Sequence, residues 1–346
     1  MTGPRVTAVV LAYGAEPVLG ECVHALLDSA GADVDVVLVD NGCTTDAVER
    51  LRDVTGVTVV TPGTNTGFAG GCNLGARHAE SPVLAFVNGD AVVRPGALRA
   101  LADALEDETV GLASGSLRLY DEPDVMNSAG NPVHFTGLSW AGGLGEPAAD
   151  HATPQDVASA TGAATAVRAD RFAELGGFCE PMFAYCEDAE LSLRTWQHGW
   201  RVRYVPDAVV LHRYEFSRNP LKSYLLERNR LFLVATLYER RTLLVLLPVL
   251  VALDAAVALV ALRQGWFREK ARGWWWLLQH RGEVAGRRRL VQESRRVPDR
   301  EVLRLLTGDF APGESTGLAA PAPLRVASRG YWAVARRVLR VSVTRP

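Results

Sequence analysis

Short apolar runs rich in β-branched residues alternate with helix-type patterns in the N-terminal part of the chain, and this alternation restricts the fold more than any other feature. A strand, helix, strand order of this kind indicates a mainly parallel sheet with helices on both faces. We therefore predict an α/β fold, in which ligands bind beyond the carboxyl ends of the strands. The runs lie at 6–11, 34–39, 57–60 and 83–87, and helical patterns around 22–27 and 51 separate the first three.

Composition bounds the size and surroundings of this fold. The 346 residues, 48% of them hydrophobic, can bury one large core and leave room for an appendage. The net charge of -2 conceals a basic segment, because 263–300 holds eleven Arg or Lys and four acidic residues; such a surplus favours an anionic partner, either a membrane or a nucleic acid. The five cysteines form no CxxC pair, and no signal-type segment precedes the first apolar run, which predicts reduced thiols in the cytosol.

Polar residues follow the predicted strands. Tyr13 comes after the first, Asp40 after the second, a glycine-rich stretch at 65–77 after the third, and Asp90 after the fourth. Each has a structural explanation as a turn or a helix cap, but together they mark one edge of the sheet. The glycine-rich stretch is not GxGxxG and does not follow the first run, so an NAD-dependent enzyme is the weaker interpretation, and the sequence contains no GxxxxGK[ST] phosphate loop.

An acidic cluster marks the start of a later helix. Glu187, Asp188 and Glu190 stand where an aromatic segment gives way to a helical pattern that ends at Gly199. Acidic side chains in a first turn stabilise a helix by about 0.3–1 kcal/mol each, and this is the structural explanation. The alternative is that one carboxylate, beside aromatic rings and like charges, is a general base. His212, after apolar runs at 202–211, is either an ordinary surface histidine or a metal ligand.

Several segments together resemble the inverting family 2 glycosyltransferases of GT-A fold, particularly their rhamnosyltransferase-like and galactofuranosyltransferase-like branch. As an ordered set they are specific, whereas any one alone is weak. The resemblance covers about residues 5–232. The segments are VVLAY at 9–13, VDNGCTTD at 39–46, NTGFAGGCNLGA at 65–76, VNGD at 87–90, GGFCEPMFAYCEDAELSLR at 176–194, HGWRVRYVPDAVVLH at 198–212 and ERNR at 227–230.

The resemblance implies a Rossmann-like GT-A sheet and a role for each matching residue. The metal motif departs from the family pattern, since Asn88 is neutral and only Asp90 carries charge, so the donor diphosphate would supply much of the metal coordination. Gly14 stands where relatives commonly have Asn. The implied roles are nucleotide binding for Tyr13 and Asp40, contact with the nucleotide sugar for Gly70 and Asn73, ligation of Mg²⁺ or Mn²⁺ for Asp90 and His212, and deprotonation of the acceptor hydroxyl for Asp188.

One metal ion that neutralises the leaving diphosphate and one carboxylate base suffice for a single inverting displacement. We therefore expect transfer of a sugar from a dTDP-, UDP- or GDP-linked donor to a hydroxyl of a glycan or polyprenyl-linked acceptor in cell-envelope polysaccharide synthesis. The branch favours dTDP-rhamnose, with UDP-galactofuranose behind it. The alternative is a non-catalytic nucleotide-sugar-binding scaffold of GT-A fold, which the thin metal motif supports.

The C-terminal third predicts contact with a membrane. Residues 243–262 are apolar and long enough to span a bilayer, but Pro248 and Asp254 favour a re-entrant or in-plane helix over a span; packing on the catalytic core is the alternative. Tryptophans among the basic residues favour lipid headgroups over nucleic acid, so we expect no nucleic-acid partner. We expect a catalytic domain at 1–232, a helical membrane-associating region at 233–310, a linker and basic amphipathic tail at 311–346, and peripheral or monotopic association with an anionic membrane surface on the cytoplasmic side.

Overall fold

A computed structural model describes residues 3–213, 219–310 and 322–341 of the chain. These residues form two compact units. The first unit contains the described residues up to Asn131 together with 141–195 and 200–213. The second contains 132–140, 196–199 and the described residues from Asn219 onward.

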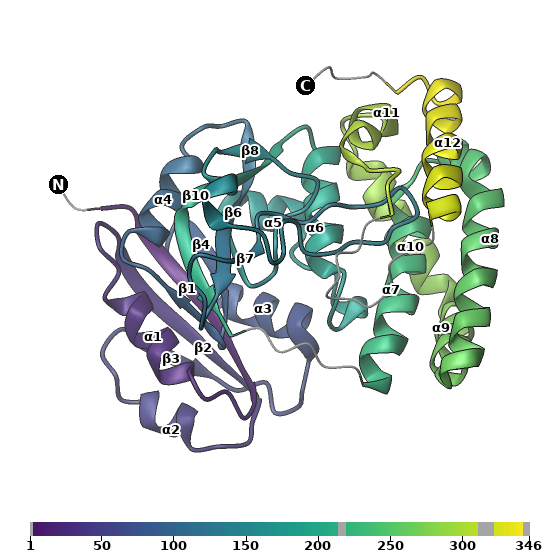
Figure 1. Ribbon diagram of the computed structural model, residues 1–346. Coiled ribbons are helices and arrows are strands. Elements are labelled where there is room, and N and C mark those ends of the chain that lie inside the picture. Colours follow the sequence, from purple (N-terminus) through teal and green to yellow (C-terminus); the bar gives the residue numbers. More distant parts are fainter. Residues whose placement is uncertain (1–2, 214–218, 311–321, 342–346) are drawn as a thin grey trace. The chain divides into compact units, whose positions relative to one another are not determined.

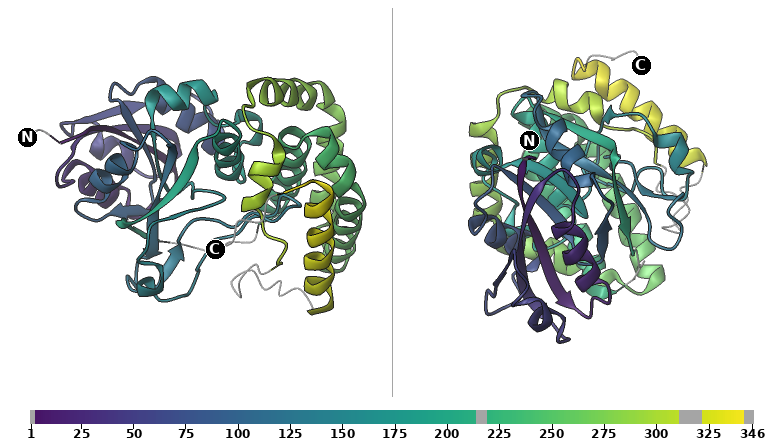
Figure 2. Two further views of the ribbon diagram at one scale, coloured as in Figure 1. Left: turned by 90° about the horizontal axis from the view of Figure 1, so that it is seen from above. Right: turned by 90° about the vertical axis from the view of Figure 1, so that its left-hand side faces the viewer.

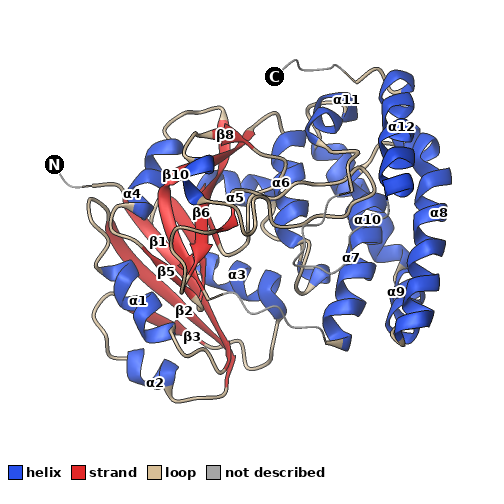
Figure 3. Cartoon of the chain, viewed as in Figure 1, coloured by secondary structure: helices blue, strands red, loops and turns tan. Residues whose placement is uncertain are grey.

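The first unit is built on a ten-stranded mixed sheet (Figures 1 and 3). Its strand order is β3-β2-β1-β4-β9-β6-β10-β5, with β7 added to β6 and β8 to β10. Neighbours are parallel from β3 to β4 and between β6 and β10, whereas β9 and β5 run antiparallel to their partners. The strands are β1 (Arg5–Gly14), β2 (Asp33–Cys43), β3 (Val57–Val60), β4 (Val83–Asn88), β5 (Ala91–Val93), β6 (Val110–Leu119), β7 (Met126–Ser128), β8 (Gln155–Asp156), β9 (Ala164–Arg168) and β10 (Arg201–His212).

Helices cover both faces of this sheet, as predicted. Alternate residues of β1 point to opposite faces. Val6, Ala8 and Val10 share the main core with buried residues of α1 and α4, whereas a Cβ atom added to Gly75 of α3 would lie 2.3 Å from Val9. The predicted α/β class is confirmed. The helices of this unit are α1 (Leu19–Leu27), α2 (Ala47–Leu51), α3 (Gly67–Arg77), α4 (Ala97–Ala104), α5 (Ala169–Leu175) and α6 (Glu187–Gln197).

Two strand predictions differ from the structure. The small-residue run at 158–167 indicates one strand by its sequence, but only its second half forms β9. The apolar runs at 202–205 and 208–211, on either side of Pro206, indicate two short strands, but they form one strand, β10, whose register with β6 shifts between Val205 and Val209. Pro206 lies inside this shift and has no N–H to donate to a neighbouring strand, so the chain bulges there and then resumes its pairing.

The second unit is helical (Figure 2). Pro248 lies inside α8 without ending it, and Gly265, with φ of 82°, terminates that helix. The proposed catalytic-domain boundary at residue 232 falls within α7, and that domain assignment stays a prediction. Of the linker predicted at 311–323, residues 311–321 lie outside the described residues, and Ala322 and Pro323 begin α12. The helices are α7 (Pro220–Leu237), α8 (Arg240–Gln264), α9 (Phe267–Gln279), α10 (Arg281–Ser294), α11 (Asp299–Val302) and α12 (Ala322–Val338).

Candidate active site

The carboxyl ends of β1 and β2 bring Tyr13 and Asp40 close together. Asp40 pairs in register with Ala12, the residue before Tyr13. The Tyr13 side chain is 56% exposed, and a Cβ atom added to Gly42 would lie 3.5 Å from its ring. One carboxylate oxygen of Asp40 accepts hydrogen bonds from the N–H groups of Gly42 and Cys43. An exposed ring beside a fixed carboxylate suits the recognition of a flat, polar group such as a nucleobase or ribose.

Asn41, a neighbour that the motif analysis did not single out, ties β2 to the glycine-rich segment. Its side-chain oxygen accepts from the N–H and hydroxyl of Thr66 at 2.9 and 3.0 Å, and its amide donates to Gly67 O at 3.1 Å. Asn41 is buried. The amide also donates to Asn65 Oδ1 at 3.1 Å, and these four hydrogen bonds fix where α3 begins relative to the end of β2.

The structure gives Gly70 and Asn73 structural contacts. A Cβ atom on Gly70 would lie 2.9 Å from Thr66 Cβ. The Asn73 amide donates to Phe178 O and to Glu180 Oε1, both at 3.0 Å, and its oxygen accepts from Phe178 N at 2.9 Å. These bonds anchor the chain that leads to the acidic cluster. The predicted contact of Gly70 and Asn73 with the nucleotide sugar stays a prediction that these bonds do not support.

Asp90 and His212 meet at the end of the sheet, although they are far apart in the sequence. His212 ends β10 and pairs with Ala91, the residue after Asp90. His212 Nε2 lies 3.2 Å from Asp90 Oδ1. Asn127 Oδ1 lies 2.8 Å from His212 Nδ1, so Nδ1 carries a hydrogen, and Nε2 faces Asp90. Asn127 was not predicted as a site residue.

Glu16 is a second residue that the motif analysis missed. Its Oε2 is buried and accepts no hydrogen bond from the described residues. A Cβ atom on Gly89 would lie 1.7 Å from this oxygen, so a larger residue at that position would displace the Glu16 carboxyl group. Burial, and then the nearby charge of Asp90, raise the pKa of Glu16 to about 8. Glu16 is therefore protonated at neutral pH and adds no negative charge beside Asp90.

Asp90 and His212 suit a divalent cation that is also coordinated by the donor or by water. A carboxylate and a neutral imidazole are suitable ligands for Mn²⁺ or Mg²⁺, and Asp90 Oδ1 is buried without a hydrogen-bond donor from the described residues. Across the part of the chain that the structure describes, no group of three or more His, Cys, Asp and Glu side chains is arranged to hold a metal. Most of the coordination would therefore have to come from donor oxygens or water.

The three clustered acids at the start of α6 have three different environments. Asp188 accepts hydrogen bonds from Gly162 N at 3.2 Å, Ala189 N at 2.7 Å and Asn131 Nδ2 at 3.5 Å. Glu187 is buried, and its Oε2 has no hydrogen-bond partner among the described residues. Glu190 forms a fully buried ion pair with Arg194 at 2.7 Å, and Arg194 also donates to Gly177 O. Glu190 is therefore a structural residue.

Burial and charge shift the pKa values of Asp188 and Glu187 to different extents. Burial raises the pKa of Asp188, and its backbone hydrogen bonds oppose that shift. Burial and the charge of Asp188 raise the pKa of Glu187 well above its usual range. Because three hydrogen bonds stabilise a charge on Asp188 and Glu187 Oε2 receives none from the described residues, Asp188 is the better placed of the two to be the anion that accepts a proton.

The backbone before Asp188 is strained. Phe183, Tyr185 and Cys186 have φ angles of 65°, 67° and 67°, a left-handed region that residues with a Cβ atom rarely adopt. Such strain persists only where the surrounding structure holds it, and it is common at functional sites. Here the Phe183 carbonyl accepts a hydrogen bond from Ala69 N in the first turn of α3. This N–H group of the α3 N-terminus therefore bonds to the strained segment.

Two backbone contacts connect Asp188 with the metal motif. Asp188 is bound to Gly162 N, and the next residue, Ala163, accepts a hydrogen bond from Asn88 N at 3.1 Å. Asn88 ends β4, two residues before Asp90. Asp188, Asp90 and His212 therefore lie at the same edge of the sheet, where the strand order predicts ligand binding.

Comparison with known proteins identifies the family. Residues 4–231 match the sequence model described as "Glycosyltransferase like family 2". The chain belongs to glycosyltransferase family 2. This confirms the resemblance seen in the motifs, and it makes the protein a glycosyltransferase enzyme.

Curated relatives of this family 2 glycosyltransferase include a rhamnosyltransferase. The N-acetylglucosaminyl-diphospho-decaprenol L-rhamnosyltransferase of Mycobacterium tuberculosis (strain ATCC 25618 / H37Rv) is 29% identical over 236 residues, which are 60% of this chain and 76% of the relative. The pre-mycofactocin glycosyltransferase of the same organism is 29% identical over 183 residues, 51% of this chain and 37% of its own length.

Solved structures agree with the GT-A fold. GalNAc-T7 with UDP, GalNAc and Mn²⁺ superposes with a TM-score of 0.55 at 18% identity over 67% of this chain and 48% of its own, so the match spans about half of that protein. The mannosyltransferase PcManGT of Pyrobaculum calidifontis, with GDP-Man and Mn²⁺, has a TM-score of 0.51 at 17% identity over 99% of this chain and 89% of its own. These similarities show the fold alone.

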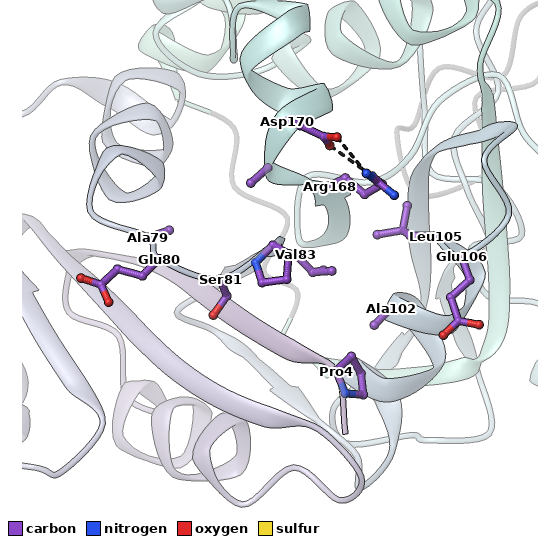
Figure 4. A pocket seen from close by; sticks show the side chains of 12 residues that line it. Pro4, Ala79, Glu80, Ser81, Val83, Ala102, Leu105, Glu106, Arg168 and Asp170 are labelled. Atoms are coloured by element: carbon purple, nitrogen blue, oxygen red, sulfur yellow. Dashed lines mark hydrogen bonds and ion pairs between the residues drawn. The ribbon is translucent and has the colours of Figure 1, made fainter. Parts of the chain in front are cut away.

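A cavity of about 640 Å³ lies at the opposite edge of the glycosyltransferase sheet (Figure 4). Pro4 and Ser81, just before β1 and β4, line it together with Val83, the first residue of β4, and Arg168 and Asp170 form an ion pair at 2.8 Å on its wall. Val83 and Arg168 are paired in register, whereas Asp188 is connected with the other end of β4. This cavity is therefore separate from the candidate active site.

Proposed function

We propose that this family 2 glycosyltransferase is a metal-dependent, inverting enzyme that uses a nucleoside diphosphate sugar. The observation that carries the proposal is the placement of Asp188, as an anion, at the same sheet edge as the Asp90 and His212 pair. A base must reach the acceptor hydroxyl while the leaving diphosphate is held nearby. Asp188 and the pair provide these two functions from separate elements.

Each side chain has one task in the proposed reaction. Tyr13 and Asp40 bind the nucleoside portion of the donor. Asp90 and His212 would hold a Mg²⁺ or Mn²⁺ ion, which would neutralise negative charge on the leaving diphosphate. Asp188 takes the proton of the acceptor hydroxyl, and the oxygen attacks the anomeric carbon from the side opposite the diphosphate, which inverts the configuration. Gly162 N and Asn131 orient the Asp188 carboxylate.

The donor, acceptor and location follow from the relatives and remain proposals. The rhamnosyltransferase relative is named for a polyprenyl diphosphate acceptor, which favours rhamnose from dTDP-rhamnose and a polyprenyl-linked glycan acceptor in cell-envelope polysaccharide synthesis. UDP-galactofuranose, other UDP-sugars and GDP-sugars are the competing donors. We place the enzyme at the cytoplasmic face of the membrane through residues 233–310 and the tail beyond 311, with 1–232 as the catalytic domain.

A donor panel tests the proposal. Purified protein is incubated with dTDP-rhamnose, UDP-galactofuranose, UDP-glucose or GDP-mannose, with or without Mn²⁺ and a short polyprenyl diphosphate glycan, and release of the nucleoside diphosphate is measured. We expect release from one donor only when both Mn²⁺ and the acceptor are present. Thermal stabilisation by each donor measures binding separately. Metal-independent release, or release from no donor, would contradict the proposed reaction.

The small number of protein metal ligands favours one alternative. A protein that binds a sugar nucleotide without transferring it needs no strong metal site, and the described residues provide only Asp90 and His212. The panel separates the two functions, since such a scaffold would be stabilised by a donor but would release no nucleoside diphosphate with any acceptor.

A further inference from the structure

Helix α8 presents one wholly apolar side to solvent. Its exposed apolar residues recur at helical spacing, and the largest among them are 53–72% exposed. Its most apolar 18-residue window has a mean hydropathy of 2.8, and 6% of that window is buried. A core helix of a soluble protein buries such residues, and monomers rarely leave a continuous apolar surface of this length uncovered. The exposed set includes Leu244, Leu247, Val251, Leu259 and Leu262.

The opposite side of α8 packs inside the second unit. Thr242, Leu246, Leu250 and Ala261 are its buried residues. Asp254 lies on the same side, because it is four positions after Leu250 and seven positions, about two helical turns, before Ala261. The helix therefore has an inner side fixed by the protein and an outer side without a partner among the described residues.

Asp254 fixes the inner side through a buried ionic cluster with α7 and α9. Its Oδ1 lies 2.9 Å from Arg230 Nη2 and 2.8 Å from Lys270 Nζ, and its Oδ2 accepts from Trp274 Nε1 at 2.8 Å. Glu227 pairs with the same two cations at 3.2 and 2.6 Å. The cluster balances two positive and two negative charges, and Arg230 and Lys270 are almost completely buried. Removing Asp254 from it would leave uncompensated buried charge.

This cluster is incompatible with a helix that crosses a bilayer. At about 1.5 Å per residue, α8 is about 37 Å long, enough for a span. A span would take the centre of α8 to the centre of the hydrocarbon layer, and Asp254 with it. The Arg and Lys partners from α7 and α9 would have to follow or be abandoned, and ionised groups at that depth are strongly disfavoured.

Helix α12 extends the outer surface. It contacts α8, and the two helices lie next to each other (Figures 1 and 2). Tyr331 donates to Val245 O, and Arg241 donates to Val338 O at 2.8 Å. Val326 and Val334, eight positions apart on one side of α12, are 68% and 59% exposed.

Basic residues predominate around this surface, although Arg325 and Arg329 of α12 are paired with Asp309. Arg240, Arg241 and Arg263 flank the apolar part of α8, whose one acid, Asp254, is in the buried cluster. Helix α12 contains four arginines and no acidic residue. Apolar side chains with arginines at their margins match a membrane surface, where the apolar groups reach the acyl chains and the cations meet anionic headgroups.

We propose that α8 and α12 form an in-plane docking surface for an anionic bilayer, with α8 lying parallel to the membrane instead of spanning it. This inference specifies how the enzyme would meet the membrane in the proposed function. It rests on the proposed function in one respect: the membrane is taken as the source of the lipid-linked acceptor. The outer residues of α8 and Val326 and Val334 of α12 enter the interface between headgroups and acyl chains. The Asp254 cluster stays within the protein.

Vesicle binding of the full chain tests the surface. Sedimentation with phosphatidylcholine vesicles containing about one third phosphatidylglycerol is compared for wild type and the triple variant Leu247→Gln, Val251→Gln, Leu259→Gln. The variant removes three apolar side chains that would be buried in the bilayer, so binding to the vesicles should weaken at least tenfold. A matched triple variant, with Leu226→Gln, Leu278→Gln and Leu290→Gln at exposed positions of α7, α9 and α10, should bind within about threefold of wild type. Equal loss in both variants, or none in either, would overturn the assignment.

Thiol labelling tests the orientation. Arg240→Cys and Gln264→Cys place a thiol at each end of α8, both at exposed positions. Protein is added to the outside of sealed vesicles and treated with a membrane-impermeant maleimide, and the labelled peptides are identified by mass. An in-plane helix leaves both thiols reactive. Protection of one thiol until detergent is added would mean that α8 spans the bilayer and would refute the proposal.

Light scattering without lipid excludes the other occupant of this surface, a second copy of the chain. We expect a monomer. A dimer that the α8 triple variant dissociates would assign the surface to self-association. None of these three measurements uses a sugar nucleotide. A failed transfer assay would therefore contradict the proposed function without affecting the docking surface, and a failed vesicle assay would contradict the docking surface without affecting the proposed reaction.

Discussion

Neighbouring carboxylates at the start of α6 differ because each has different partners. Glu190 is paired with buried Arg194, Glu187 is buried with an unbonded oxygen, and Asp188 receives three hydrogen bonds. The helix-dipole explanation applies equally to all three residues and does not account for this difference. The residue that can act as a base is the one whose charge is stabilised by backbone N–H groups.

Replacing Asp188 tests that assignment. We expect Asp188→Asn to keep donor binding and lower the transfer rate by roughly 10²–10⁴-fold, because the acceptor proton then has no base. Glu187→Gln imitates the protonated neighbour and should retain activity within a few-fold. Rates with saturating donor, and donor affinity by calorimetry, are the measurements. A fully active Asp188→Asn enzyme, or equal loss in the two variants, would exclude this role.

The rate should also depend on pH in a predictable direction. Burial raises the pKa of Asp188, and a base acts only when deprotonated. The rate should therefore fall on the acidic side at a higher pH than for an exposed aspartate, and it should be constant above that limb until another group titrates. A pH profile of kcat with metal and donor saturating measures the limb. A profile that stays flat down to the usual range of aspartate would argue against a buried base.

Asn127 should control metal affinity without touching the metal. Because Asn127 holds Nδ1 of His212, Asn127→Leu should let the ring turn or change tautomer and weaken Mn²⁺ binding by roughly 10–100-fold. Asn127→Asp retains an acceptor for Nδ1 and is the matched control, with affinity at least equal to wild type. Mn²⁺ titration in the presence of nucleoside diphosphate, followed by electron paramagnetic resonance, gives the affinity directly. Unchanged affinity in Asn127→Leu would remove this positioning role.

At the scale of elements, the start of α3 and the strained segment before α6 form one unit. Gly67 has φ of 72°, and a Cβ atom there would lie 2.3 Å from Phe183 O. The close approach lets Phe183 O accept from Ala69 N, which helps to hold the strained residues that precede Asp188. Gly67 therefore allows the two chain segments to meet.

Alanine substitutions at two glycines test this packing. Gly67→Ala should lower the free energy of unfolding by about 1–3 kcal/mol through overpacking, and lower the transfer rate because the Phe183 segment is displaced. Gly20→Ala, in α1 with no atom within 4 Å of the added Cβ, should stabilise by up to about 1 kcal/mol. Denaturant unfolding and initial rates measure both effects. Equal stability of the two variants would contradict the packing argument.

At the scale of the whole molecule, each of the two units has its own buried interior. The first unit has a continuous apolar core between its sheet and helices. The second combines apolar contacts with buried polar ones, such as the Asp254 cluster and His134, whose ring nitrogens lie 2.7 Å from the Thr136 hydroxyl and 2.9 Å from that of Ser328. Buried ionisable groups make the stability of a unit sensitive to pH.

Mild acid should therefore destabilise the second unit. Burial lowers the pKa of His134 to about 4, so below pH ~6.5 the unfolded chain takes up a proton that the folded unit does not. The free energy of unfolding should fall by about 2 kcal/mol between pH 6.5 and 5 from this group, with no contribution above ~6.5. Removing the histidine with His134→Gln should abolish this part of the slope, whereas His78→Gln, at an exposed position, should retain it. Identical slopes in wild type and His134→Gln would refute the assignment.

Much of the architecture is encoded locally. Residues 57–60 form a strand with the predicted bounds, and helices begin and end near the predicted signals, because apolar periodicity depends only on neighbours in the chain. Tyr13, Asp40 and Asp90 were predicted to share one edge for a similar reason: the carboxyl ends of parallel strands face the same way. The family motifs added Asp188 and His212.

Contacts between distant segments could not be predicted from periodicity or motifs. Glu16, Asn127 and Asn131 carry no periodic or motif signal, although Glu16 closely follows β1 and Asn127 lies in β7. The ionic partners of Asp254 lie 24 and 16 positions away, so a charged residue that was an anomaly within an apolar sequence becomes a satisfied one in the folded unit. Local spacing specifies which elements form. Charge compensation, proton location and surface exposure depend on which elements meet, and those follow from packing in three dimensions.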